Sequence, residues 1–264
     1  MDMLKRDLAP LSESAWNEID KRAEAILKTS LSARKAVKVI GPKGWDHTAI
    51  SEGRLDITDA QEGEVKTGVY KVQPLIEGRM SFSLDRWEMD NITRGAKDID
   101  LTALDIAVKK IVTFEENALF NGLDAANITG LINGSDNEPI PFGQDGATIM
   151  DAVTKGLIIL KENFEDSPYT LLVGKEAWTR LNKEVQGYPL INRIENLTGG
   201  KVLFSSVIEG AILIPFDNDN LELTIGQDFA IGYEYHDSKE VSLFITESFT
   251  FRVLDGSIIV PYIM

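Results

Sequence analysis

One long hairpin with few large apolar residues constrains this chain more than any other feature. Residues 50–72 read ISEGRLDITDAQEGEVKTGVYKV and alternate apolar and polar residues around a QEGE tip, the pattern of two antiparallel strands. The faces carry few large apolar residues, and a two-stranded hairpin is at best marginally stable in water by itself. We therefore expect this hairpin to lie against another chain.

The remaining pattern predicts an α+β fold, with helices early and in the middle of the chain and a strand-rich end. A helix is predicted from about Ser14 to Ala33, where apolar residues recur at helical spacing. The longest helix is predicted over residues 98–121, and a strand is predicted over residues 72–84. The unbroken apolar run 167–174 predicts a buried strand.

Composition excludes several classes of function. The chain has 264 residues, 43% of them apolar, and a net charge of −15. Such an acidic surface repels phosphate backbones, so we expect no nucleic acid as the main partner. The absence of cysteine excludes thiolate zinc sites and cysteine nucleophiles. Because no leader or membrane-spanning run is visible, we predict a soluble cytoplasmic protein that does not bind membranes.

The stretch LDRWEMDNITRG is the strongest candidate for chemistry. Its acids Asp85, Glu88 and Asp90 could be paired carboxylates or metal ligands. Neither a strand nor a bend would reliably bring two of them within the roughly 5–10 Å that glycoside hydrolysis needs. Arginines nearby favour salt bridges, and the histidines His47 and His236 lack metal-binding spacing. We therefore predict no catalytic residue and no metal site.

Trp87 lies in the same stretch and has two interpretations. A tryptophan beside Arg79 or Arg86 could stack a planar ligand, whose phosphate or ring oxygen an arginine would bind. Alternatively, Trp87 is a partly buried anchor of a subunit contact or a hairpin contact. The chemistry of these residues alone favours the structural interpretation.

Several blocks of sequence together resemble the encapsulins, the linocin-like shell proteins of bacterial and archaeal nanocompartments. The blocks run from residue 2 to the C-terminus with similar lengths between them, and their order makes the resemblance specific. They read LKRDLAPLSESAWNEID, GPKGW, PLIEGRMSFSLDRWEMDN, QGYPL, IGQDFAIGYE and LFITESFTFRV.

The resemblance implies the fold of tailed-phage major capsid proteins, with a peripheral domain, an axial domain and an extended loop. It assigns an N-terminal arm, a helix and the first peripheral strand to 1–49, and the extended loop to 50–72. The peripheral domain with its spine helix is expected over 73–134, and the axial domain over 135–225. Residues 226–264 are expected to return to the peripheral sheet. The acids and arginines around Trp87 would then tie the base of the extended loop to the spine helix.

The resemblance also implies a docking site for cargo enzymes, which carry a C-terminal targeting peptide. The site is expected between the N-terminal helix and strands of the peripheral domain, although Leu27 and Leu31 could equally be core residues. Lys38 stands where family members often have an acid, so the cargo peptide is expected to differ in charge. The matching positions are Ile26, Leu27, Leu31, Arg34, Lys38, Phe229 and Ile231.

Two further sites follow from the resemblance. Some encapsulins hold a flavin such as FMN against the tryptophan that matches Trp87, with an arginine that matches Arg79; the shell itself requires no cofactor. A loop near 183–190 is expected to line the five-fold pore. Its pore-lining residues are Lys183, Glu184, Gln186, Gly187 and Tyr188.

We therefore predict a non-enzymatic protein that assembles, as sixty subunits, into an icosahedral shell around a cargo enzyme. The expected cargo is a ferritin-like protein or a dye-decolourising peroxidase, which would serve iron storage or oxidative-stress defence. One alternative is a prophage major capsid protein. An alternative from another class is a peptidase or bacteriocin-like activity, for which the chain carries no catalytic constellation.

Overall fold

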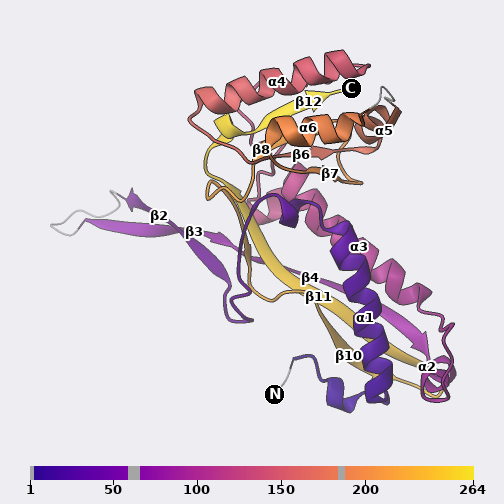
Figure 1. The fold of residues 1–264 in the computed structure, drawn as a ribbon. Helices are drawn as coiled ribbons and strands as arrows, with labels where there is room; N and C mark the ends of the chain where they lie inside the picture. The colour runs from indigo at the N-terminus through magenta and orange to yellow at the C-terminus, as the bar shows by residue number, and fades with distance from the viewer. Residues whose placement is uncertain (1–2, 59–65, 184–187) are drawn as a thin grey trace.

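The structure, a computed structural model, describes residues 3–58, 66–183 and 188–264. The tip of the expected extended loop and the predicted pore residues Glu184, Gln186 and Gly187 lie outside these ranges. Figure 1 shows two layered bodies joined along β11 and α3, with a two-stranded hairpin projecting to one side. This arrangement agrees with the predicted α+β class.

The first sheet is built around β11 (Glu240–Val253). Along one edge β11 pairs antiparallel with β4 (Ile76–Asp85). Along the other edge it pairs with β10 (Ala230–His236) and then with β9 (Leu221–Ile225). The short strand β1 (Lys38–Ile40) joins β9 in parallel. Most of β11 is buried, because it lies in the centre of the sheet and helices cover one face.

Two long helices, α1 (Glu13–Ser30) and α3 (Thr102–Asn121), lie side by side against this sheet (Figure 1). Both helices are close to the predicted ranges, although α1 ends three residues early. Arg22 joins them by donating two hydrogen bonds to the Asp105 carboxylate, at 2.7 and 2.5 Å. The apolar stripe of α1 therefore faces the molecule, as its spacing predicts.

The second sheet has five strands in the order β5, β12, β8, β6 and β7, and it includes the predicted strand 167–174. Helices α4, α5 and α6 pack around it. The strands are β5 (Ile140–Pro141), β6 (Tyr169–Val173), β7 (Val202–Phe204), β8 (Ala211–Pro215) and β12 (Val260–Ile263). The helices are α4 (Gly146–Glu162), α5 (Lys175–Lys183) and α6 (Leu190–Thr198). Short 3₁₀ turns are η1 (Arg6–Leu8), η2 (Ala33–Lys35), η3 (Asp124–Ala126) and η4 (Gly256–Ile258).

Two strands lie in a different sheet from the one predicted for their segments. β9 belongs to the first sheet, although 135–225 was assigned to the axial domain. β12 pairs with β8 and β5 of the second sheet, although 226–264 was assigned to the peripheral sheet. The alternation of apolar residues predicts that a segment is a strand, but it does not identify the strand's partner. The chain therefore crosses between the two bodies more often than the predicted boundaries imply.

The hairpin consists of β2 (Ala49–Thr58) and β3 (Thr67–Pro74), close to the predicted 50–72. It projects away from both sheets (Figure 1). Leu55 faces Tyr70 across the strands, and Ile57 lies two residues further along the same face. These side chains are 50%, 72% and 72% exposed. One face of the hairpin is thus apolar and uncovered in the single subunit.

The stretch around Trp87 forms a short helix, α2 (Arg86–Thr93), that directly follows β4. Asp85 caps it by accepting a hydrogen bond from the Glu88 amide at 2.9 Å. Glu88 in turn accepts from the Asp100 amide, just before α3, at 2.9 Å. These acids tie the end of β4 to the start of α3. The prediction that they tie the base of the extended loop is wrong, because the hairpin joins the other end of β4.

None of the helices described is both long enough and apolar enough to cross a membrane.

Candidate functional site

The expected docking region contains two adjoining hollows beside α1. Their volumes are about 300 and 380 Å³. Glu24, Leu27 and Phe229 line both of them, so the hollows form one groove between α1 and the start of β10. We call these two hollows together the α1 groove.

The groove exists because α1 uses only part of its apolar stripe for the core. Trp16, Ile19 and Ala23 are buried, whereas Leu27 near the end of the helix is only partly buried. Phe229, also partly buried, faces it from the sheet. The result is an apolar floor with charged residues along the rim.

Five of the seven predicted docking residues line this groove: Leu27, Leu31, Arg34, Phe229 and Ile231. The other two have different neighbours. Ile26 packs against the apolar core beneath α1. Lys38 forms ion pairs with Asp217 at 3.5 Å and Asp219 at 3.4 Å, and the attraction of these acids raises its pKa. The structure therefore does not place these two side chains in the groove.

Arg34 lines the groove, and its guanidinium group already forms ion pairs with acids of the same subunit. Its guanidinium pairs with Glu115, with Asp228 at 2.7 Å and with Glu247 at 3.1 Å, and it lies 4.7 Å above the Phe229 ring. Burial alone would lower the pKa of Arg34, but the carboxylate of Glu115 and the other acids raise it above the ordinary value. Arg34 thus holds its charge and fixes the groove wall.

Glu115 and Glu247 have no solvent exposure at all. Burial, and then the neighbouring charge of Glu115, raise the pKa of Glu247 well above its ordinary value. Oε1 of Glu247 is buried and has no hydrogen-bond donor among the described residues. A raised pKa favours the neutral form of Glu247, which carries no charge for Arg34 to offset.

A second buried acid, Glu116, anchors the turn that carries Arg34. Its carboxylate accepts hydrogen bonds from the Ser32 hydroxyl, from the Ala33 amide at 2.8 Å and from Ser205 at 3.2 Å. Burial raises the pKa of Glu116, although these hydrogen bonds oppose the effect. The η2 turn is therefore tied to both α3 and the second body.

The acids at this site were missed by sequence reasoning. Glu115 and Glu116 lie on a helix whose buried residues are otherwise almost all apolar, which is a detectable signal. Asp228 directly precedes Phe229 in the family-like block IGQDFAIGYE. Glu247, by contrast, is far from Arg34 in the sequence, and the two residues come into contact only in the folded chain.

Trp87 is 69% exposed on α2, with the Arg94 guanidinium 5.6 Å from its ring. Arg79 lies over Phe244 at 4.2 Å and pairs with Glu77 at 3.1 Å. About 23 Å of chain separates Arg79 from the start of α2 at Arg86, at roughly 3.3 Å per residue. Within one subunit, these two side chains do not close around a single ring.

Of the predicted pore residues, the structure describes Lys183 and Tyr188. Lys183 is exposed at the end of α5. Tyr188 is 51% exposed, and its hydroxyl accepts a hydrogen bond from the Asn196 amide at 3.2 Å. Both are accessible in the single subunit.

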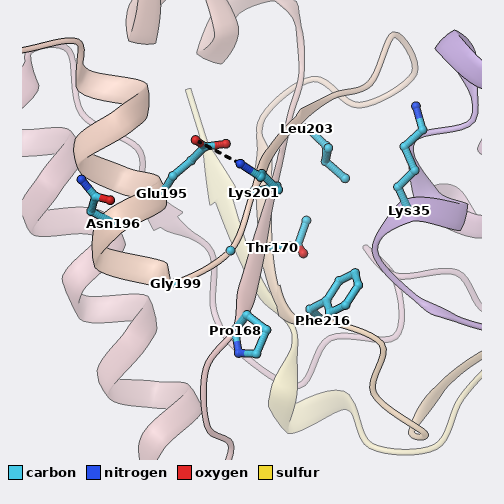
Figure 2. A pocket seen from close by; sticks show the side chains of 10 residues that line it. Lys35, Pro168, Thr170, Glu195, Asn196, Gly199, Lys201, Leu203 and Phe216 are labelled. Carbon is cyan, nitrogen blue, oxygen red and sulfur yellow. Dashed lines mark ion pairs between the residues drawn. The ribbon is translucent and has the colours of Figure 1, made fainter.

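A larger pocket of about 680 Å³ opens between η2 and the second sheet. Figure 2 shows Thr170, Leu203 and Phe216 close together and Lys35 on the separate η2 segment, with its side chain directed away from Phe216. Sequence reasoning gave no indication of this pocket, because its walls come from four separate segments. Among the described residues, no group of three or more acids and histidines is arranged to hold a metal ion.

Comparison with solved structures first identifies the fold of the chain. A solved virus-like particle from Pyrococcus furiosus has a similar fold, with a TM-score of 0.69 at 14% identity over 93% of this chain and 98% of that one. A structure from Gordonia phage Cozz has a TM-score of 0.55 at 12% identity over 88% and 86%. The predicted capsid-protein fold is therefore confirmed.

Sequence then identifies the family. The family model Linocin_M18, described as "Encapsulating protein for peroxidase", matches residues 1–250. The type 1 encapsulin shell protein of Rhodospirillum rubrum is 37% identical over 99% of this chain and 96% of its own length. The chain belongs to the encapsulin family and is a shell protein rather than an enzyme. This relationship decides against the phage-capsid and peptidase alternatives, since the phage similarity extends to the fold alone.

Proposed function

We propose that this shell encloses a cargo enzyme whose C-terminal targeting peptide binds in the α1 groove. The observation that carries the proposal is the groove itself, in which Leu27, Phe229 and Ile231 form an apolar floor at the end of a helix. Extended peptides bind such surfaces through alternate apolar side chains.

The rim of the groove favours a particular charge in the peptide. Asp20, Glu24 and Asp228 supply acids, and Asp20 already pairs with Arg6 at 2.7 Å. Glu24 pairs with Lys28 on the surface of α1. Asp228 is 45% exposed although it contacts Arg34. A peptide with apolar residues and a basic residue near Asp228 would therefore fit. Asp228 would pair with this basic residue, as the acid at position 38 is expected to do in other family members.

The proposed cargo is a dye-decolourising peroxidase or a ferritin-like protein, which would give oxidative-stress defence or iron storage in a cytoplasmic compartment. The description of the family as encapsulating a peroxidase supports the first. The cargo gene is expected beside the shell gene, and its last residues would carry the targeting peptide. Sequencing that neighbourhood supplies the candidate peptides.

The docking proposal is tested by loading. Each candidate peptide is fused to a fluorescent protein and co-expressed with the shell, and the fluorescence of purified shells is measured. Leu27→Asp is expected to lower loading at least about tenfold, since an unpaired carboxylate on an apolar contact costs more than about 1.4 kcal/mol. Ile158→Asp, at a 51% exposed position on α4, is the matched control and should load normally. Equal loading of both variants would contradict the proposal.

We also propose a shell of sixty subunits, with a pore lined by the loop that contains Tyr188. The exposed apolar face of the hairpin supports assembly, because Leu55, Ile57 and Tyr70 need a covering partner. Electron microscopy of the purified protein measures the size of the shell directly. A particle with a different number of subunits, or a protein that stays monomeric, would contradict this part.

A flavin site is proposed at Trp87 alone. Its exposed ring can stack an isoalloxazine, and Arg94 rather than Arg79 of the same subunit is the nearby cation. Flavin absorbance in purified shells that disappears in Trp87→Ala would support the site. Native shells without bound flavin after incubation with FMN would argue against it.

A further inference from the structure

The pocket between η2 and the second sheet adjoins the α1 groove. Lys35 lines both the pocket and the adjoining hollow of the groove. The backbone amide of Asp217 donates to the Ala36 carbonyl at 2.9 Å, which holds the Phe216 segment against η2. The α1 groove and this pocket therefore adjoin at Lys35, with Ile231 on β10 in the far hollow of the groove and Phe216 in the wall of the pocket.

The charged groups around this pocket are matched with one another. Lys35 donates through Nζ to the Lys28 carbonyl at 2.6 Å, at the end of α1. Lys201 lies 3.7 Å from Glu195, which also accepts a hydrogen bond from the Val202 amide at 3.2 Å. Because Lys35, Lys201 and Glu195 already have partners within the protein, they do not require an ionic ligand in the pocket.

Apolar surface remains uncovered between these charged groups. Phe216 is 50% exposed, and Leu203 and Pro168 extend the surface beside it. Figure 2 shows the Phe216 ring and the Leu203 side chain bordering the same open space, with Gly199 leaving its edge free of a side chain. A pocket of about 680 Å³ is wide enough for a large apolar side chain.

We propose that this pocket is a second anchor for the cargo's targeting segment and takes a Leu, Ile or aromatic side chain. The proposal rests on docking of that segment in the α1 groove. From Asp20 to Leu31 the groove follows about 17 Å of helix at 1.5 Å per residue. An extended peptide covers that length with about five residues at roughly 3.3 Å each. Residues beyond these five would pass Lys35 and reach Phe216.

The absence of cysteine from the chain makes a direct test available. Single cysteines are introduced as Leu27→Cys in the groove, Phe216→Cys in the pocket and Phe164→Cys at a 98% exposed control position. Shells are purified empty, and loaded with a fluorescent protein that carries the last ~20 residues of the cargo, long enough to span both cavities. The rate of modification by N-ethylmaleimide is then measured for each variant.

Loading is expected to create a slow phase at positions 27 and 216, whose amplitude equals the fraction of subunits occupied, and none at 164. A peptide shortened to the groove-binding residues should protect 27 and leave 216 fully reactive. Protection at 27 without protection at 216 by the long peptide would overturn the second anchor and leave the proposed function intact. Protection at neither would overturn both. If Phe216→Cys fails to assemble, Lys201→Cys on the pocket rim, 75% exposed, gives the same readout.

Discussion

Nη2 of Arg34 lies 3.1 Å from Oε2 of Glu247, a carboxyl group with no solvent exposure. The same guanidinium also pairs with Glu115, which is equally buried. One cation therefore serves two buried acids that come from α3 and β11. Since Arg34 also lines the α1 groove, the shape of the groove depends on this buried cluster.

Replacing Arg34 by methionine is expected to destabilise the subunit by about 3–5 kcal/mol, because it leaves buried acids without a compensating charge. The midpoint of unfolding in guanidinium, measured on assembled shells, reports the loss. Lys109→Met, at an exposed position on α3, serves as control and should stay within about 0.5 kcal/mol of the native protein. An Arg34→Met shell as stable as the control would show that the cluster does not depend on Arg34.

The stability of the native protein should also depend on pH through Glu247. Its folded-state pKa is raised above the unfolded value, so its favourable contribution is complete below the unfolded pKa and is lost as pH rises through the folded pKa. Each unit of raised pKa corresponds to about 1.4 kcal/mol.

Glu247→Gln mimics the protonated acid and removes this titration. The native protein should lose stability relative to Glu247→Gln as pH rises from about 5 to about 9, because only the native carboxyl must ionise in a buried site. Unfolding midpoints of both shells across this range give the comparison. A constant difference between the two proteins would mean that Glu247 does not titrate there.

Local patterns in the sequence were sufficient for the helices α1 and α3 and for the hairpin, because each depends on residues close together in the chain. Helix α2 was missed, since an eight-residue helix directly after a strand has too few turns for a clear period. The assignment of β12 to the second sheet and the meeting of Arg34 with Glu247 both depend on long-range packing. The docking residues came from family resemblance, and the buried acids behind them required the structure.

Gln73 fixes the base of the hairpin to the first sheet. Its side-chain amide is buried and donates to Thr250 Oγ1 at 3.0 Å and to the Phe251 carbonyl at 2.8 Å. Gln73→Leu should destabilise the subunit by about 1–3 kcal/mol, because it leaves the buried carbonyl unsatisfied. Unfolding midpoints measure the cost, with Lys71→Leu on the neighbouring, more exposed strand position as control. Equal midpoints would indicate that solvent reaches these acceptors.

The apolar face of the hairpin is expected to drive assembly. Ile57→Glu should yield folded subunits that do not form closed shells, since the carboxylate would be buried without a partner at the contact. Val69→Glu, 65% exposed on the opposite face, is the matched control and should assemble. Size-exclusion chromatography and electron microscopy distinguish the two outcomes, and circular dichroism checks the fold. Normal shells from Ile57→Glu together with failure of Val69→Glu would assign the contact to the other face.

A substitution at Lys38 tests whether this residue belongs to the docking site, as the family resemblance implies, or lies outside it, as the structure indicates. The position suggested a docking residue, yet its ammonium group faces Asp217 and Asp219 and lies outside the α1 groove. Lys38→Gln should therefore leave peptide loading unchanged. Asp228→Asn should lower the loading of a peptide with a basic residue, since it removes a partly exposed acid that lines the groove beside Phe229. Both variants are compared in the fluorescence assay at several salt concentrations. A strong loss in Lys38→Gln, with Asp228→Asn unaffected, would return position 38 to the docking site.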